Sequence, residues 1–331
     1  MSAIDRASPV RQGLERAQWR QLALITVAAV AIFLTLRALP TGTNLSHMDF
    51  RVDPRAGKAI EFCDPSNPQF IPVVAVRSPV VMTVATATPA MAGAPVRGTV
   101  GLHTASGKPL APEDLLYSHT RKMHLLVVDK SLEDYQHVHP EPGRRPGDWN
   151  FSFTPHRSGA YRIFADFTPA ATSRGLYASV DLNVAAANAE RATVPPSAPR
   201  ESSAENVVAA GGASRVVERD GYRFSLTPAQ PVIRAGEPAE LALAISRADG
   251  SSVPLEPVMD ALAHLVAFDQ ARSGFAHLHP AQSDLDRVSG PSHPVLHFKL
   301  MIPSGGRYVI WAQLNLGGRE TFVPFWFDVA G

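Results

Sequence analysis

Two stretches of the sequence gather histidines at short spacings that repeat along the chain. Residues 119–141 contain four histidines, and two of them stand one residue apart directly before Pro140. Residues 264–281 show the same pattern before Pro280, displaced by 140 positions. The repeated histidines are His124, His137 and His139 in the first stretch and His264, His277 and His279 in the second.

The spacing predicts that each set of three imidazoles shares one face of a β-hairpin. Side chains at i and i+2 of a strand point to the same face. "HLLVV" reads as one strand and "HVH" opens the next, so a register that pairs His124 with His139 and Leu126 with His137 aligns all three rings. Three imidazoles suit Cu(II) or Zn(II). Asp129 and, in the second copy, Asp269 are the acids that we expect to orient a ring.

Two other interpretations of the histidines stay open. They could form a structural hydrogen-bond cluster, or a surface that faces a partner or responds to pH. The exchange of apolar neighbours favours a ligand role, because Val127 and Val128 became Ala267 and Phe268 while the histidines were kept. Copper is the preferred metal, zinc is second, and a chain without metal remains an alternative. No cysteine accompanies the histidines, which argues against a blue-copper centre.

The histidine stretches belong to a longer internal duplication. "AGAPVRGTVGL" and "FSFTPHRSGAYRIFADF" in the first half correspond to "AGEPAELALAI" and "FKLMIPSGGRYVIWAQL" in the second. Within each half, apolar residues alternate and turn residues recur, as in a β-sandwich. We predict an all-β fold with two tandem immunoglobulin-like or cupredoxin-like sandwiches at 78–186 and 218–331, joined by a linker at 187–217. A single large barrel is the alternative.

The N-terminal region predicts a membrane segment. Residues 22–36 are apolar apart from two threonines and follow four arginines, which favours a cytoplasmic N-terminus. We expect a cytoplasmic segment at 1–21, a single-pass inner-membrane anchor at 22–40, a stalk or lead-in at 41–77, and periplasmic or otherwise extracytoplasmic domains. A cleaved signal and a buried core helix are the alternatives to the anchor.

Composition narrows the class of protein further. The formal net charge of +1, without a basic block, gives no footprint of a nucleic-acid binder. The single cysteine, Cys63, excludes an intramolecular disulfide framework and a multi-cysteine zinc site. No nucleophile-elbow, phosphate-loop or zinc-protease motif occurs. We therefore predict a binding protein rather than an enzyme.

The pattern H-L-x-V-x-D, then H-x-H-P, then a G-x-Y strand resembles bacterial exported proteins of the YtkA-like and FixH-like β-sandwich families. These families lie near copper-handling modules such as the CopC family in fold. The resemblance implies an exported sandwich protein with a link to copper. It does not carry over the CopC site, because the N-terminus of this chain lies in the anchor sequence and offers no matching histidine.

Together these features predict a membrane-anchored tandem sandwich protein that handles copper as a chaperone, buffer or resistance factor. Its partners would be the membrane and a metal donor or acceptor. The main alternative is a structural module that docks on a membrane complex and uses the histidines for hydrogen bonding. A third hypothesis is an oxidoreductase with copper held between the domains.

Overall fold

The computed structural model describes residues 15–38, 45–50, 70–75, 78–187, 208–209, 214–281 and 292–331. These residues form one N-terminal helix and a large β-rich unit, whose described part begins at residue 45. Cys63 and the greater part of the predicted linker lie outside the described residues.

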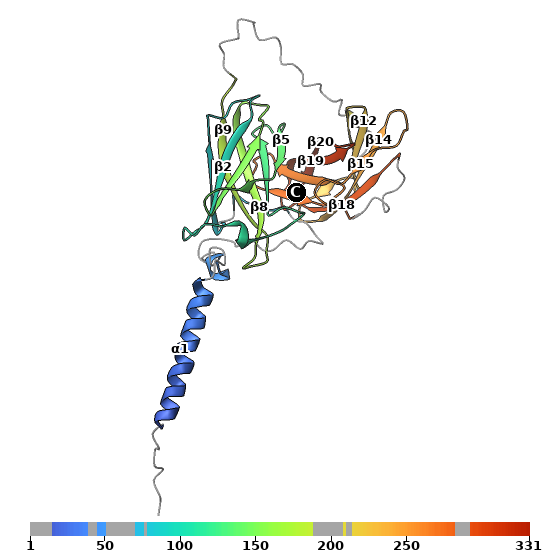
Figure 1. The fold of residues 1–331 in the computed structure, drawn as a ribbon. Coiled ribbons are helices and arrows are strands. Elements are labelled where there is room, and N and C mark those ends of the chain that lie inside the picture. The colour runs from blue at the N-terminus through green and yellow to red at the C-terminus, as the bar shows by residue number, and fades with distance from the viewer. Residues whose placement is uncertain are drawn as a thin grey trace, which may run out of the picture. The chain divides into compact units, whose positions relative to one another are not determined.

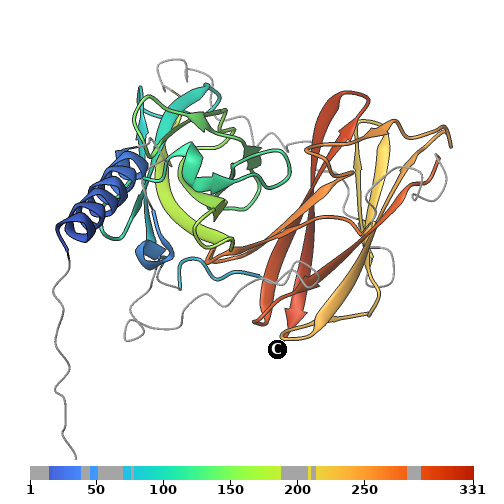
Figure 2. The ribbon, with the colours of Figure 1, turned by 60° about the horizontal axis from the view of Figure 1, so that its bottom comes forward.

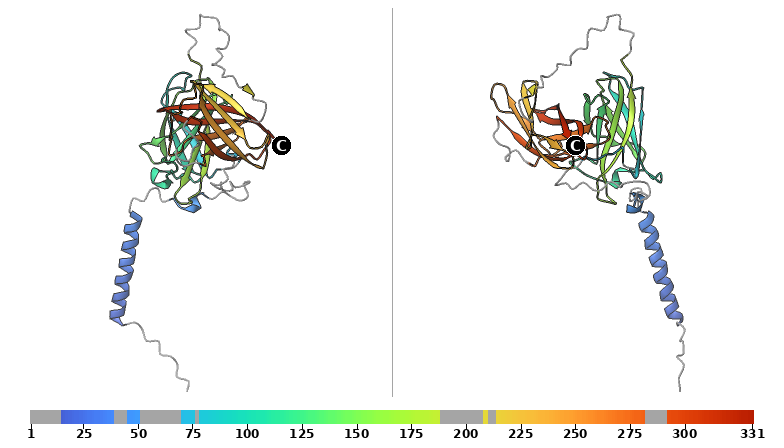
Figure 3. Two further views of the ribbon diagram at one scale, coloured as in Figure 1. Left: turned by 90° about the vertical axis from the view of Figure 1, so that its right-hand side faces the viewer. Right: turned by 180° about the vertical axis from the view of Figure 1, so that it is seen from behind.

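Helix α1 (Arg16–Ala38) is long and apolar enough to cross a membrane. Its 23 residues extend about 34 Å at 1.5 Å per residue, against a hydrocarbon core of about 30 Å. Its large apolar side chains, Leu24 and Ile25 among them, are exposed. The helix appears in blue in Figure 1 and Figure 3, and it begins six residues before the predicted anchor.

The first β-domain consists of two antiparallel sheets. One has the order β1-β2-β7-β6, and the other contains β3, β8, β4 and β5 in that order, with β9 also paired to β8. Its strands are β1 (Val80–Thr86), β2 (Val96–Thr104), β3 (Leu115–Leu116), β4 (Met123–Asp129), β5 (Tyr135–Val138), β6 (Glu141–Pro142), β7 (Asp148–Phe153), β8 (Gly159–Pro169) and β9 (Leu176–Val184). Two short 3₁₀ helices, η1 (His47–Phe50) and η3 (Pro112–Asp114), accompany them.

The second β-domain repeats this plan, and Figure 2 shows it in yellow to red. Its sheets have the orders β10-β11-β12-β14-β18 and β13-β20-β19-β16-β17, with β15 also paired to β19. Its strands are β10 (Val208–Ala209), β11 (Arg215–Arg219), β12 (Tyr222–Pro228), β13 (Ile233–Arg234), β14 (Pro238–Arg247), β15 (Leu255–Glu256), β16 (His264–Asp269), β17 (Phe275–Leu278), β18 (Val295–Met301), β19 (Gly306–Leu316) and β20 (Arg319–Ala330). The predicted all-β tandem sandwich architecture is confirmed.

Each sandwich has its own apolar core, and alternate residues of the histidine-bearing strands face it. Leu125 and Val127 of β4 belong to the first core. Leu265 and Ala267 of β16 belong to the second. The alternation expected of a strand with one buried face is therefore present on this side of both sheets.

The opposite faces of these two sheets are buried against each other. A third apolar cluster combines Leu126, Val128 and Phe164 of the first domain with Val266, Phe268, Phe275, Val309 and Trp311 of the second, among others. Every residue of β4 is consequently buried. A strand covered on both faces has a continuous apolar sequence, which explains "LLVV" and "LVAF" beside the two histidines.

The turns that close the two histidine hairpins each reach into the other domain. The Leu132 carbonyl accepts a hydrogen bond from Trp311 Nε1 at 3.2 Å. At the repeat-equivalent position, Arg272 donates to the Ala160 carbonyl at 2.9 Å. Leu132 and Arg272 have φ angles of 65° and 51°. Both turns thus share a left-handed residue that anchors the neighbouring domain.

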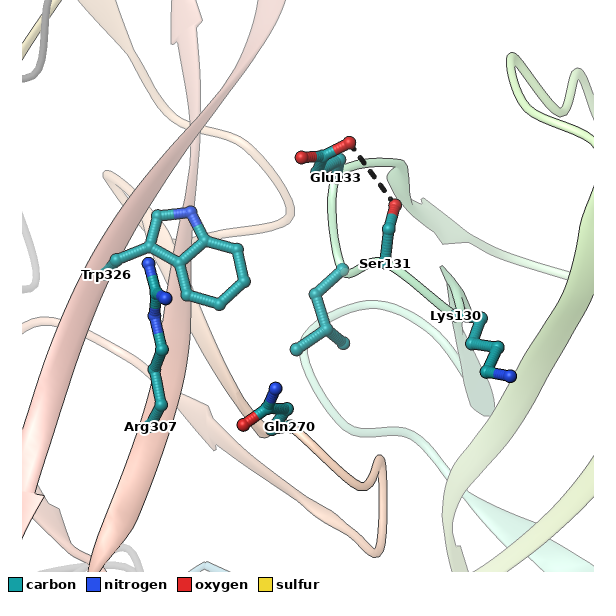
Figure 4. Close-up of a pocket in the computed structure, with 7 residues that line it drawn as sticks. Lys130, Ser131, Glu133, Gln270, Arg307 and Trp326 are labelled. Atoms are coloured by element: carbon teal, nitrogen blue, oxygen red, sulfur yellow. Dashed lines mark hydrogen bonds between the residues drawn. The ribbon is translucent and has the colours of Figure 1, made fainter.

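A surface hollow lies beside the first of these turns (Figure 4). Residues of the turn line it together with Gln270 and with Arg307, whose guanidinium lies 4.8 Å from the ring centroid of Trp326. It lies at the opposite end of strand β4 from His124, because Lys130 directly follows that strand.

Part of the segment expected to be a stalk or lead-in packs against both domains. Phe50 is buried in the first core, and Phe70 is buried in the second. The Ile71 amide donates to the Phe275 carbonyl at 2.7 Å. A Cβ added at Gly274 would stand 1.8 Å from the Ile71 carbonyl oxygen, so this close approach requires glycine.

The C-terminal end of the predicted linker also forms part of the folded unit. Strand β10 and the first residues of β11 lie inside the segment 187–217. Val216 is buried and pairs with Ser225 of β12. Valine favours a pleated, half-buried surface, and the second sandwich therefore extends further toward the N-terminus than its predicted start at residue 218.

Replacing Phe164 with alanine should test the packing between the two domains. Its ring is fully buried and lies 5.3 Å from the Phe275 ring, centroid to centroid. Removing such a ring should lower the free energy of unfolding by about 3–5 kcal/mol, measured by denaturant titration with tryptophan fluorescence. Val81→Ala, at a half-exposed position, is the control and should cost at most about 0.5 kcal/mol. Equal effects of the two substitutions would contradict the packing of these faces.

Candidate metal centre

The first histidine set lies on one hairpin, in the predicted register. Leu126 of β4 pairs with His137 of β5 in an antiparallel ladder. The same register brings His124 opposite His139. All three rings lie on the side of the sheet that carries Leu126, which faces the second domain. The hairpin prediction is confirmed.

The second hairpin reproduces the arrangement. Val266 of β16 pairs with His277 of β17, and the register brings His264 opposite His279. These rings lie on the side of Val266, which faces the first domain. The two sets, which we name the first triad (His124, His137, His139) and the second triad (His264, His277, His279), therefore meet at the interface.

Each triad brings its nitrogens together at a spacing that a metal ion could span. In both triads, one ring nitrogen from each histidine lies within 4.8 Å of the others. In the first triad, His124 Nδ1 and His137 Nε2 are 3.0 Å apart. Two ligands with metal–nitrogen bonds of about 2.0–2.1 Å are about 3–3.5 Å apart. The first triad therefore has nearly the separation that a bound ion would need.

Hydrogen bonds fix the ring protons of the first triad away from its centre. His124 Nε2 donates to the Ser118 carbonyl oxygen at 3.0 Å. His137 Nδ1 donates to Gln313 Oε1 at 2.8 Å, and the Gln313 amide is itself oriented by donating to Glu320 Oε2 at 3.1 Å. A neutral imidazole has only one N–H. The two nitrogens that face each other therefore both carry lone pairs.

The second triad has one oriented ring and several nitrogens without partners. His277 Nδ1 donates to Asp166 Oδ2 at 3.1 Å. Among the described residues, five buried ring nitrogens of the two triads have no hydrogen-bond partner: His139 Nε2, His264 Nδ1, His264 Nε2, His277 Nε2 and His279 Nε2. Buried polar atoms normally have a hydrogen-bond partner, so these five nitrogens are the atoms of the cluster whose lone pairs or protons no protein group satisfies.

The two triads are contiguous across the domain interface. The ring centroids of His137 and His277 are 5.2 Å apart, similar to the spacings within each triad. His137 also lies 5.7 Å from His264, and His124 lies 5.5 Å from His277. His137 and His277 are therefore the inner rings of one six-histidine cluster.

Burial keeps these imidazoles neutral. It lowers the pKa of His139 to about 3 and that of His279 to about 2, and the neighbouring histidines add to both shifts. The pKa of His137 and that of His277 are also held well below the usual value, primarily by burial. A metal binds the neutral form of imidazole, so the cluster stays in its ligating form at neutral and mildly acidic pH.

A seventh histidine covers the second triad from the first domain. The His119 ring stacks on that of His279, with centroids 3.7 Å apart and planes inclined by 29°. His119 and Thr120 have φ angles of 47° and 65° in a tight turn closed by Ser118 and Arg121. A left-handed pair of this kind is typical of a type I′ turn. This turn carries His119 to the histidine cluster of the other domain.

The acids predicted to orient the rings have another role. Asp129 lies five residues along β4 from His124, about 16 Å at strand spacing. Its carboxylate accepts hydrogen bonds from the Ser131, Glu133 and Asp134 amides of the hairpin turn. Asp269 likewise accepts a bond from the Ser273 amide. The prediction for these two acids is therefore corrected.

The groups that orient the rings are Asp166 and Gln313, which sequence reasoning missed. Asp166 pairs with His124 in its own sheet, and Gln313 pairs with His264. Each side chain contacts the inner histidine of the other domain. The available signal was a polar residue five positions after the tyrosine in both "YRIFADF" and "YVIWAQL".

The fold and the cluster define a tandem β-sandwich protein with paired histidine triads at its domain interface. Residues 79–185 and 215–331 both match the family described as "Domain of unknown function (DUF8832)". The matches cover more than half of the chain, so the protein belongs to this family and carries its domain twice. The comparison does not show the YtkA-like or FixH-like identity that the short motifs suggested. No curated protein matches the sequence.

Several solved structures resemble the chain at low identity. They include a DUF4785 family protein from Legionella pneumophila (9% identity, 76% of this chain, 56% of that chain, TM-score 0.25) and MtrC from Shewanella baltica (8%, 75%, 68%, 0.22). Fibronectin(III)-like modules of Clostridium thermocellum CbhA also match (9%, 75%, 93%, 0.18). The chain spans about half the length of the Legionella protein. Likeness at these scores carries no argument about function.

The neutral cluster should make the metal-free protein sensitive to acid. An unfolded histidine binds a proton below about pH 6.5, whereas His139 in the folded chain does so only near pH 3. Between these values the unfolded state binds more protons, so the free energy of unfolding falls as the pH is lowered. The slope should be at most about 1.4 kcal/mol per pH unit for each such histidine.

Denaturant titrations of metal-free protein between pH 7 and pH 4 measure this slope. His139→Gln should reduce it, because the substituted side chain cannot be protonated. His293→Gln, at an exposed position outside the cluster, is the matched control and should leave the slope unchanged. A wild-type slope that His139→Gln does not alter would contradict the neutral state of this ring.

Proposed function

We propose that this protein is a membrane-anchored, extracytoplasmic metal-binding module that handles copper through the two histidine triads. The observation that carries the proposal is the set of five buried ring nitrogens without hydrogen-bond partners in the described cluster. They lie in two groups whose ligand atoms are within 4.8 Å. The proposal assigns the protein binding, transfer or buffering of the metal and no catalysis of its own.

The lone pairs of the first triad support an ion rather than a proton at its centre. His124 Nδ1 and His137 Nε2 face each other at 3.0 Å, and both rings already donate their single N–H to outer acceptors. A proton could relieve the lone-pair repulsion only by charging a buried ring, and burial lowers the pKa of both. A cation bound by several imidazoles relieves it with bonds to each.

Copper fits this donor set better than other metals. All six triad ligands are imidazoles, which suit copper and zinc and are poor ligands for the hard cations that prefer oxygen. Copper stands above zinc in the order of divalent affinities. Zinc is the second candidate, with the tetrahedral three-histidine site open to one further ligand as its usual geometry.

The location of the module is inferred from helix α1 and its charges. Arg16 and Arg20 lie at the N-terminal end of the apolar helix, and Arg6 and Arg11 precede it in the sequence. Positive residues stay on the cytoplasmic side. The β-domains would then lie on the outer side of the inner membrane, where a copper donor or acceptor could reach them.

The competing hypothesis is a structural module that docks on a membrane complex. In that case the histidines would serve as hydrogen-bond partners within the fold. Three of the rings do have such partners, at Ser118, Gln313 and Asp166. Hydrogen bonding alone does not account for His264, however, because both of its ring nitrogens are buried without a partner.

Copper binding should be measured on the full chain in detergent micelles. After incubation with Cu(II) and desalting, elemental analysis should find up to two copper ions per chain. The variant His137→Ala/His139→Ala/His277→Ala/His279→Ala should retain none. Bound copper should also raise the unfolding midpoint of the wild type and leave that of the variant unchanged, because an ion that binds only the folded state stabilises it.

A second variant controls for adventitious binding by histidines. His156→Ala/His293→Ala/His297→Ala removes three exposed histidines outside the triads and should bind copper like the wild type. A wild-type chain that retains no copper and no zinc would contradict the proposal. The hypothesis of a structural docking module would then stand. It predicts that the variant lacking His137, His139, His277 and His279 differs from the wild type in stability alone.

Removing residues 1–38 should test the anchor. The full chain should stay in the membrane fraction after alkaline carbonate washing, because an apolar helix of this length holds a chain in the bilayer. The truncated chain, directed to the same compartment by a cleavable signal, should be recovered in the soluble fraction. If the expressed full chain is instead cut between residues 36 and 45 and its product is soluble, the segment is a cleaved signal.

A further inference from the structure

We propose that the two triads are unequal metal sites and that Asp166 makes the second triad the tighter one. This inference rests on the proposed function and adds the order in which the sites fill. It is carried by one difference between the repeats. The position that orients the inner histidine across the interface is a carboxylate in one domain and an amide in the other.

Asp166 and Gln313 are equivalent in the duplication. Asp166 lies five residues after Tyr161, and Gln313 lies five residues after Tyr308. Each pairs, in its own sheet, with the first histidine of its own triad. Each then bonds the Nδ1 atom of the inner histidine of the other domain, at 3.1 Å for Asp166 and 2.8 Å for Gln313. The contacts match in geometry and differ in charge.

A carboxylate strengthens its histidine as a ligand more than an amide does. An imidazole whose N–H donates to a carboxylate gains electron density at its other nitrogen, and such outer partners typically alter metal affinity about 10–100-fold. The other nitrogen of His277, Nε2, is buried and without a partner. The charge of Asp166 also acts on His124 of the first triad, its cross-strand partner. What distinguishes the second triad is the hydrogen bond, which Asp166 makes to His277.

The surroundings of the first triad are less favourable to a cation. The amide of Gln313 is neutral, and the acid behind it, Glu320, is exposed to solvent. Arg121 adds positive charge near this triad and helps to lower the pKa of His139. At His124 its effect on the pKa is smaller than the opposite effect of Asp166. A first ion bound at the second triad would repel another across His137 and His277, whose rings are 5.2 Å apart. The sites should therefore fill in sequence.

Competition titration of the full chain in detergent micelles, with Cu(II) buffered by a chelator of known affinity, tests the inequality. The wild type should show one tight and one weak class of copper. Two single variants, each lacking the equivalent histidine of one triad, show which triad holds which class of copper. His279→Ala should lose the tight class, and His139→Ala should keep it.

Two exchanges then test the role of Asp166 as a positioning residue. Asp166→Asn keeps the size and the hydrogen-bond acceptor of the side chain and removes its charge. It should weaken the tight class by about 10–100-fold and the weak class by a smaller factor, because the hydrogen bond is made to His277 while only the charge reaches His124. Gln313→Glu adds the charge at the equivalent position and should tighten the weak class by a similar factor. A merely structural role of Asp166 would not predict the second effect.

The outcomes separate this inference from the proposed function. Two copper sites of equal affinity, or a tight class that survives His279→Ala, would overturn the inequality while leaving copper handling in place. The inequality would also be overturned if both Asp166→Asn and Gln313→Glu bound copper with the affinities of the wild type. Copper absent from the wild type would instead contradict the proposed function itself. Unfolding midpoints of all variants confirm that each is folded.

Discussion

Six imidazole rings lie between two apolar sheet faces, three of them fully buried and three partly buried, and the other features of the interface depend on that burial. An unsatisfied polar group costs about 1–3 kcal/mol when it is buried, and five ring nitrogens of the cluster are in this state. The aromatic contacts between the domains, Phe164 with Phe268 and Phe275 among them, offset this cost. These apolar contacts and the hydrogen bonds to Gln313 and Asp166 hold the histidines close together, and burial keeps the rings neutral.

The positions of the histidines within each hairpin could be predicted from the sequence because they depend on local rules. The strand period of two places His137 and His139 on one side. The turn length between "HLLVV" and "HVH" then fixes the register that brings His124 beside them. The duplication gave an independent copy of the same pattern, and the tandem sandwich fold followed from the same periodicity.

The burial of that side, and the residues that orient the rings, depend on how the domains pack, which local rules do not determine. Asp166 and Gln313 act on histidines 111 and 176 residues away in sequence. Asp129, close to His124 in sequence, was the natural candidate for orienting a ring. Its carboxylate is instead engaged by the backbone of its own turn, because an acid at a strand end satisfies the nearest free amides.

The reciprocal contacts make the pair of domains the functional unit. In each triad the inner histidine is oriented by the other domain, and His119 crosses the interface to cover His279. A single domain would expose its three imidazoles to water, lose the contact that fixes its inner tautomer, and leave the face containing Leu126 or Val266 uncovered. Two copies together therefore provide the burial of the imidazoles and the hydrogen bonds to the inner histidines, which a single domain lacks. The one difference between the two reciprocal contacts is that a carboxylate, Asp166, orients His277 and an amide, Gln313, orients His137.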